Sequence, residues 1–123
     1  KIDSSPKINI DSMLVPSAAT LELVELLNSA GPYGPSAKAP TFVFANMQIS
    51  FVKRVGTSHL KIKFGDITGS LEAICFNAFE KEIGQALEKH DGRSIHLCGR
   101  LDINYWRGKR TVQLLLDDAQ FAV

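Results

Sequence analysis

Two aromatic residues and three cationic residues lie close together near the end of the chain: Tyr105, Trp106, Arg107, Lys109 and Arg110. Aromatic rings stack on nucleobases and cationic groups neutralise phosphates, so this combination is typical of sites for single-stranded nucleic acid. The same composition occurs at hairpin tips that only need to stay solvated. The predicted structure around the cluster has to decide between a binding site and a solvated hairpin tip.

The cluster is flanked by two stretches in which apolar and polar residues alternate, as in strands with one buried face. Gly99 falls in the apolar row of the first stretch. Pairing Ile103 with Val112 and Leu101 with Leu114 leaves Arg107-Gly108 as a two-residue turn. The sequence therefore predicts one long β-hairpin over residues 93–118 with the cluster at its tip.

A second basic segment lies between residues 53 and 63, which hold four basic residues and no acid, although the net charge of the chain is only +1. Acidic residues gather between the two basic segments, at Glu80, Glu82, Glu88 and Asp91. If folding brings the basic segments together, a weakly charged protein still presents a positive surface.

Strand patterns fill most of the chain after residue 40. The first runs over 41–55 with a predicted buried row of Val43, Ala45, Met47, Ile49 and Phe51. A second carries Leu60, Ile62 and Phe64, and a third covers residues 70–77. Residues 78–90 predict one amphipathic helix through Phe79, Ile83 and Leu87.

The resulting order is three strands, a helix and two strands. This predicts a mostly β protein, a five-stranded OB-fold Greek-key barrel with one helix between strands 3 and 4. In that fold the face of strands 2 and 3 and the loops 1-2 and 4-5 bind oligonucleotides. We expect the two basic segments to meet there, and the acidic helix to lie on the far side.

Residues 1–40 differ in composition and predict a separate N-terminal segment before an OB domain at 41–123. Ile8 and Ile10 alternate with polar residues as in a short strand with no evident partner. A helix is predicted with Ser17 as N-cap, ending at Gly31-Pro32, and a Pro/Gly-rich linker follows. The absence of an initiator Met suggests a fragment of a longer protein. Cys75 and Cys98 predict reduced thiols in a cytoplasmic protein.

The candidate nucleic-acid contacts divide into phosphate partners and stacking groups. The phosphate partners are Lys53, Arg54, His59, Lys61, Lys63 and Arg100, and the hairpin tip contributes Tyr105, Trp106, Arg107, Lys109 and Arg110. Each exposed cation on a strand also has a purely solubilising interpretation. Phe64 and Phe76 could stack on bases, but their register with aliphatic residues favours the core.

Catalytic and metal-binding interpretations find little support. His59, His90 and His96 are dispersed, and Asp117 and Asp118 are consecutive strand residues that point to opposite faces. No P-loop or nucleophile elbow occurs. The sequence predicts no catalytic residues, metal ligands or cofactors in this chain, and no apolar run suggests a membrane partner.

Three segments are similar to a known family. VKRVGTSHLKIKF, LEAICFN and LDINYWRGKRTVQLLLDDAQF resemble the C-terminal OB domain of RecJ-type single-strand-specific exonucleases. INIDSM, the following helix and GPYG resemble the end of the preceding DHH-associated domain, where this chain continues with PSAKAP instead of the family's GNPEP.

The resemblance implies a module that guides single-stranded DNA in a 5′ to 3′ exonuclease of DNA repair and recombination. The metal-dependent chemistry, with Mg or Mn, would belong to catalytic DHH domains of the same polypeptide, and repair proteins would be further partners. Fold alone leaves open an OB-fold module that binds protein or RNA and has no nuclease partner domain.

Overall fold

The structure is a computed structural model that describes residues 10–30 and 40–122. Ile8 of the predicted first strand, the predicted helix stop at Gly31-Pro32 and nearly all of the linker lie outside these residues. The boundary between 1–40 and 41–123 therefore stays a prediction.

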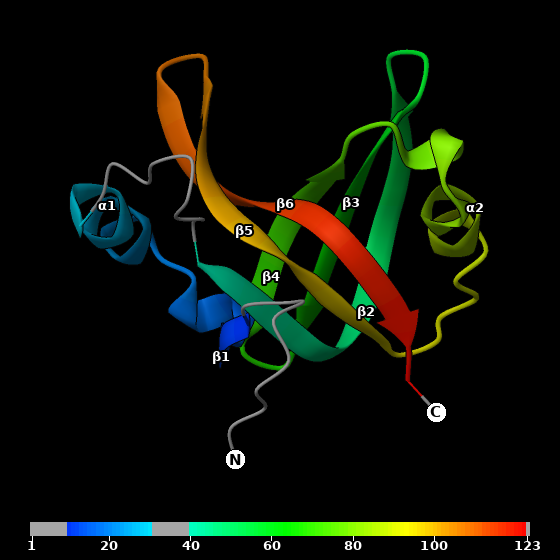
Figure 1. Ribbon diagram of the computed structural model, residues 1–123, viewed down its shortest axis with the longest axis horizontal. Helices are drawn as coiled ribbons and strands as arrows, with labels where there is room; N and C mark the ends of the chain where they lie inside the picture. Colours follow the sequence, from blue (N-terminus) through cyan, green and yellow to red (C-terminus); the bar gives the residue numbers. More distant parts are fainter. Residues whose placement is uncertain (1–9, 31–39, 123) are drawn as a thin grey trace.

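Six strands form one sheet in the order β1-β2-β3-β4-β6-β5, and an additional pairing of β2 with β5 closes the last five into a barrel (Figure 1). The strands are β1 (Ile10–Met13), β2 (Thr41–Val55), β3 (His59–Asp66), β4 (Gly69–Cys75), β5 (Ile95–Trp106) and β6 (Lys109–Phe121). The helical segments are η1 (Pro16–Ala18), α1 (Leu21–Ala30), η2 (Ala78–Glu80) and α2 (Glu82–Glu88). This confirms the five-stranded OB-fold barrel.

The β5–β6 hairpin has the predicted register. Ile103 lies opposite Val112 and Leu101 opposite Leu114. Arg107 and Gly108 both have positive φ, 51° and 76°. Positive φ at both central residues is the geometry of the type I′ turn, whose twist matches that of a hairpin. Figure 1 shows this hairpin and the β2–β3 hairpin extending beyond the barrel at the same end of the molecule.

The predicted buried row of β2 is wrong in its first half and at its last member. Phe42 and Phe44 are buried, Val43 and Ala45 are half-buried, and Phe51 is exposed. The pairing of β2 shifts register twice, between Phe44 and Met47 and between Ile49 and Phe51. Bulges of this kind bend a strand and move its following side chains to the other face. β2 needs them because it pairs with β5 through its first half and with β3 through its second.

The N-terminal strand β1 does have a partner, contrary to the prediction. It pairs in parallel with the start of β2, Ile10 opposite Thr41 and Met13 opposite Val43. The Leu14 amide donates a further hydrogen bond to the Val43 carbonyl oxygen at 2.9 Å. This pairing joins residues far apart in the sequence, so local sequence patterns do not predict it.

Both predicted helices differ in detail. The α1 helix begins later than expected, because Thr20 rather than Ser17 is its N-cap and accepts a hydrogen bond from the Leu23 amide at 3.1 Å. The predicted single helix over 78–90 is two short pieces, η2 and α2, separated by an extended residue, Lys81 (φ −132°). The pieces pack so closely that a Cβ on Gly84 would lie 2.6 Å from the Ala78 carbonyl oxygen.

The core fills the barrel with side chains from every barrel strand. Phe44 and Phe64 meet edge to face with ring centroids 5.4 Å apart. Leu87 from α2 and Ala19 from the N-terminal segment join the same cluster. Among the described residues no helix is long and apolar enough to cross a membrane.

Candidate nucleic-acid interface

The outer face of β2, β3 and β4 gathers most of the predicted basic strand residues. Lys53 lies opposite Lys61, and Lys61 lies opposite Ile74. The next pair along the same strands joins Lys63 with Glu72. Residues directly opposite in an antiparallel pair share a face, and Leu60, Ile62 and Phe64 occupy the opposite, buried face. These lysines therefore point away from the core. We call this surface the outer face.

Two exposed phenylalanines lie on the outer face among these lysines. Phe51 is opposite Lys63 and 48% exposed, and Phe76, just after β4, is 50% exposed. Phe76 meets the His59 ring edge to face at 5.2 Å between centroids. The prediction of a core position is right for Phe64 and wrong for Phe76, which points outward because the strand alternation continues past Cys75. The exposure of Phe51 was not predicted, because no feature of the sequence indicates the bulge that turns its side chain outward.

The register of the β5–β6 hairpin extends the outer face to its tip. Gln113 pairs with Glu72 of β4 and with Asp102 of β5. Two and four residues further out, Asn104 lies opposite Thr111 and Trp106 opposite Lys109. Trp106 is 63% exposed, and the Arg107 guanidinium lies 4.5 Å from its ring centroid. The tip thus adds a third exposed aromatic ring and two cations.

Tyr105 and Arg110 lie on the other face of this hairpin, toward α1. They are opposite each other in the register. Arg110 forms an ion pair with Glu25 of α1, and Tyr105 remains 70% exposed. The five residues of the predicted cluster are therefore divided between two faces, because consecutive strand residues alternate.

Arg54 also points away from the outer face. Its register partner is the buried Leu60, and its guanidinium donates two hydrogen bonds to the Glu88 carboxylate at 2.8 and 3.0 Å. It also lies 4.3 Å from the Phe79 ring centroid. The hydrogen bond from Arg54 lowers the pKa of the Glu88 carboxyl, and the same bond raises the pKa of Arg54. The expectation that the acidic helix lies away from both basic segments is wrong here, since α2 is held against β2.

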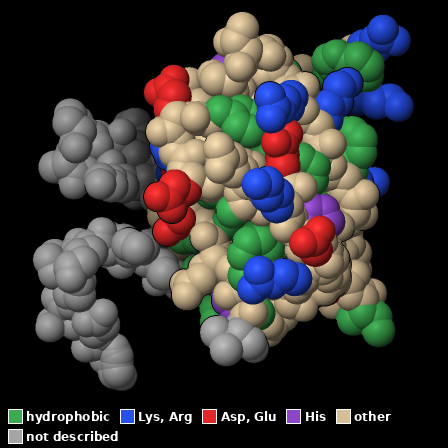
Figure 2. Space-filling view, turned by 90° about the vertical axis from the view of Figure 1, so that its right-hand side faces the viewer, with side chains coloured by type: hydrophobic (Ala, Val, Ile, Leu, Met, Phe, Trp, Pro, Cys, Tyr) green, Lys and Arg blue, Asp and Glu red, His purple; other side chains and the backbone are tan. Residues whose placement is uncertain are grey.

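The remaining cations differ in how they are paired. Lys61 lies 3.4 Å from a Glu72 carboxylate oxygen, and Arg100 lies 3.6 Å from Asp117. Lys53, Lys63 and Lys109 have no carboxylate of the described residues within ion-pair distance. Figure 2 shows basic side chains interspersed with hydrophobic and acidic ones on one side of the molecule. The cations of the outer face without an ion-pair partner among the described residues are therefore Lys53, Lys63, Lys109 and Arg107.

The side chain of each histidine accepts a hydrogen bond from a backbone amide. Nδ1 of His59 accepts the Asn77 amide at 2.9 Å, Nδ1 of His90 accepts the Gly92 amide, and Nδ1 of His96 accepts the Asn46 amide. A neutral ring in this arrangement carries its hydrogen on Nε2. His59 therefore presents an Nε2–H donor at the edge of the outer face.

Neither cysteine is paired, as predicted. Burial raises the pKa of the Cys75 and Cys98 thiols, which keeps them protonated and poorly nucleophilic. Within residues 10–30 and 40–122 no three His, Cys, Asp or Glu side chains gather as metal ligands do.

Comparisons with known proteins give consistent results. The family model described as "RecJ OB domain" matches residues 10–118. The chain is 33% identical over 111 residues to the single-stranded-DNA-specific exonuclease RecJ of Escherichia coli (strain K12), covering 88% of this chain and 18% of that protein. It is 24% identical over 119 residues to the same-named protein of Bacillus subtilis (strain 168), covering 95% of this chain and 15% of that protein.

A solved structure of a replication protein A heterotrimer bound to ssDNA is similar at 12% identity and a TM-score of 0.49, over 91% of this chain and 81% of that one. The chain spans only 15% to 18% of the length of the two RecJ proteins.

Proposed function

Because this chain belongs to the RecJ OB domain family, we propose that it is the single-stranded-DNA-binding module of a 5′ to 3′ single-strand-specific exonuclease. In this proposal the chain holds the strand and guides it to catalytic DHH domains of the same polypeptide, in cytoplasmic DNA repair and recombination. Mg²⁺ or Mn²⁺ would act in those domains. The described residues gather no ligand set that fits either ion, so we assign this chain no step of the hydrolysis.

One observation carries the proposal: Phe51, Phe76 and Trp106 are exposed on the same face of the sheet as Lys53, Lys61 and Lys63. Exposure of an aromatic ring to water is unfavourable and does not improve solubility. Three such rings among lysines on one face therefore indicate a binding surface. Bases stack on such rings whatever their sequence, and lysines neutralise the phosphates between them.

The unpaired lysines should contribute most to phosphate binding. Lys53 and Lys63 have no carboxylate among the described residues to displace, whereas Arg54 would have to abandon two hydrogen bonds to Glu88. Arg54 is therefore assigned to holding α2 against β2, and the lysines to the strand.

The test is the salt dependence of binding to a fluorescently labelled oligodeoxynucleotide. Each phosphate contact contributes about −0.7 to the slope of log K against log salt for a single strand. We expect Lys63→Ala and Lys53→Ala each to flatten the slope by about that amount. Arg54→Ala is the matched control and should lower the melting temperature with the slope unchanged. Binding that ignores salt, or a duplex bound as tightly as the single strand, would refute the proposal.

A further inference from the structure

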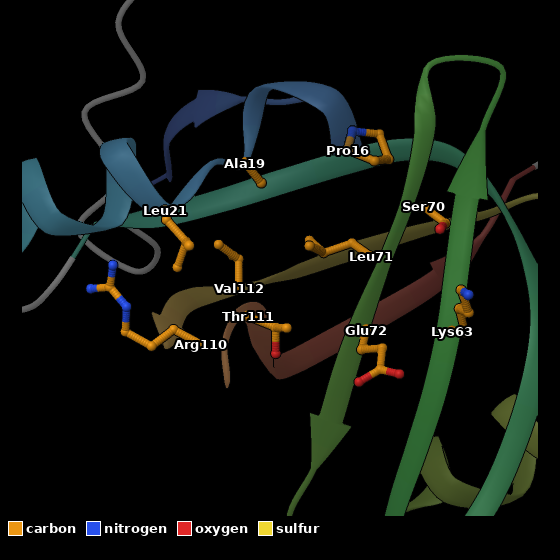
Figure 3. A pocket seen from close by; sticks show the side chains of 10 residues that line it. All are labelled: Pro16, Ala19, Leu21, Lys63, Ser70, Leu71, Glu72, Arg110, Thr111 and Val112. Atoms are coloured by element: carbon orange, nitrogen blue, oxygen red, sulfur yellow. The ribbon is translucent and has the colours of Figure 1, made fainter. Parts of the chain in front are cut away.

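A cleft of about 400 Å³ lies between the N-terminal segment and the barrel (Figure 3). It exists because β4 and β6 pair only from Glu72 and Gln113 onward, so the first residues of both strands diverge. The N-terminal segment closes the far side of the gap, where Pro16 and Ala19 are buried and the Ser17 amide donates to Thr68 Oγ1 at 3.4 Å.

The cleft combines an apolar lining with polar groups at its edges. Figure 3 shows the apolar side chains between Arg110 at one end and Lys63 with Glu72 at the other. Two hydroxyl groups, Ser70 and Thr111, also line it and have no hydrogen-bond partner among the described residues. The apolar lining consists of Pro16, Ala19, Leu21, Leu71 and Val112.

The position of the cleft relates it to the outer face. Thr111 is two residues from Lys109 on β6, and Lys109 lies opposite Trp106 at the hairpin tip. On the other side, Lys63 lies opposite Phe51. A strand that runs from Trp106 toward Phe51 and Phe76 therefore crosses the mouth of the cleft.

We propose that this cleft is a subsite for one nucleobase of the bound strand, an inference that rests on the function proposed above. Its volume falls within the range of small-ligand sites. The apolar lining suits the faces of a base, and the Ser70 and Thr111 hydroxyls suit its edge. The Glu72 carboxylate accepts hydrogen bonds from base amino groups and repels phosphate, so the base enters and its phosphate stays near Lys63.

This assignment gives the N-terminal segment a part in binding. Pro16, Ala19 and Leu21 form one wall of the cleft, and the ion pair of Glu25 with Arg110 fixes α1 against β6 at its end. Residues 16–25 thus shape the subsite in addition to packing on the barrel.

The experiment measures the affinity of the whole 123-residue chain for single-stranded oligodeoxynucleotides that carry one abasic site, moved one position at a time. For the wild type we expect one position whose base occupies the cleft. Loss of the base at that position should weaken binding about 5- to 150-fold. The variant Ser70→Phe fills the cleft from an exposed strand position, so it should bind the intact strand more weakly and no longer distinguish that abasic position.

Gln120→Phe is the control, because it introduces the same ring at an exposed position near the other end of β6. It should keep the full abasic profile. Thr111→Phe repeats the test from the opposite rim of the cleft if Ser70→Phe does not fold, as judged by circular dichroism.

The results separate the two proposals. Salt-dependent binding of single strands with a profile that Ser70→Phe or Thr111→Phe leaves unchanged overturns the subsite and leaves the proposed function standing. A chain that binds no single strand overturns both.

Discussion

Trp106 and Tyr105 are neighbours in the chain with different surroundings. Trp106 shares the outer face with the unpaired lysines, and its ring is already covered on one side by Arg107. Tyr105 faces the α1 side, opposite Arg110. The two rings have similar exposure. Any difference in their contribution to DNA binding should therefore come from the face of the hairpin on which each ring lies.

We expect Trp106→Ala to weaken binding of single-stranded DNA by about 1–3 kcal/mol, because it removes one base-stacking platform. The melting temperature should change little, since an exposed ring leaves no cavity. Tyr105→Ala is the matched control and should bind more nearly like the wild type. Affinity and melting temperature are measured on the same samples. Equal losses for both variants, or a loss of stability with normal affinity for Trp106→Ala, would remove Trp106 from the site.

Arg54, Arg110 and Phe51 have surroundings that residue type and spacing do not predict. Charge and spacing identified the two arginines as exposed cations, but their partners Glu88 and Glu25 lie 34 and 85 positions away. Only folding shows that these charges are already neutralised. Phe51 was assigned to the core because its apolar character fits a row that a bulge interrupts.

At the scale of elements, the parts governed by local pairing were predictable. The β5–β6 hairpin follows from alternation and a two-residue turn, and the two predicted pairs, Ile103 with Val112 and Leu101 with Leu114, are confirmed. The register shift between Cys98 and Gly99 was not predicted. The barrel order followed from counting strands. By contrast, the parallel pairing of β1 with β2 joins segments far apart in the sequence, which local patterns do not predict. The break at Lys81 was missed because the apolar spacing of Phe79, Ile83 and Leu87 continues through it as in one helix.

The bulge in β2 can be tested at Asn46, whose φ of 58° lies in the left-handed region. Asn46→Val should destabilise the protein by about 1–2 kcal/mol, since a β-branched residue resists this conformation. Asn104→Val makes the same chemical change within a regular stretch of β5 and should cause no comparable loss. Urea unfolding gives both values. An Asn46→Val variant as stable as the wild type would show that the bulge shifts elsewhere at no cost.

The contact of α2 with β2 should respond to acid. Arg54 lowers the pKa of the Glu88 carboxyl in the folded state. The ion pair therefore stabilises the folded protein at pH values above the pKa that this carboxyl has in the unfolded chain. That contribution is lost as the pH falls through the folded-state pKa. The melting temperature of Glu88→Gln should therefore lie below that of the wild type at neutral pH and converge with it in acid.

The background of Arg54→Ala provides the control for this experiment, because Glu88 has no charged partner there. Glu88→Gln should then change the melting temperature much less, and the pH-dependent difference should disappear. A difference between wild type and Glu88→Gln that persists unchanged into acid would mean that packing of the side chain, and not its charge, holds the helix.

At the scale of the whole molecule, the His, Cys, Asp and Glu side chains of residues 10–30 and 40–122 do not gather into a metal-binding cluster, and several of them hold the fold instead. Each of the three histidines uses Nδ1 to accept a backbone amide. Asp117 pairs with Arg100, and Asp118 accepts the amide of Ala119. The exposed rings of Phe51, Phe76 and Trp106 and the unpaired lysines, by contrast, remain available on the outer face.

We therefore expect the purified chain to bind an oligodeoxynucleotide without hydrolysing it in the presence of Mg²⁺ or Mn²⁺. The measurement is nucleotide release from a labelled strand over a range of metal concentrations, compared between wild type and Trp106→Ala. Release by a contaminating nuclease would be equal in the two preparations, because it does not depend on this surface. Metal-dependent release that falls in Trp106→Ala in parallel with its affinity would instead place a catalytic site on this chain, against the proposed assignment of the chemistry to DHH domains.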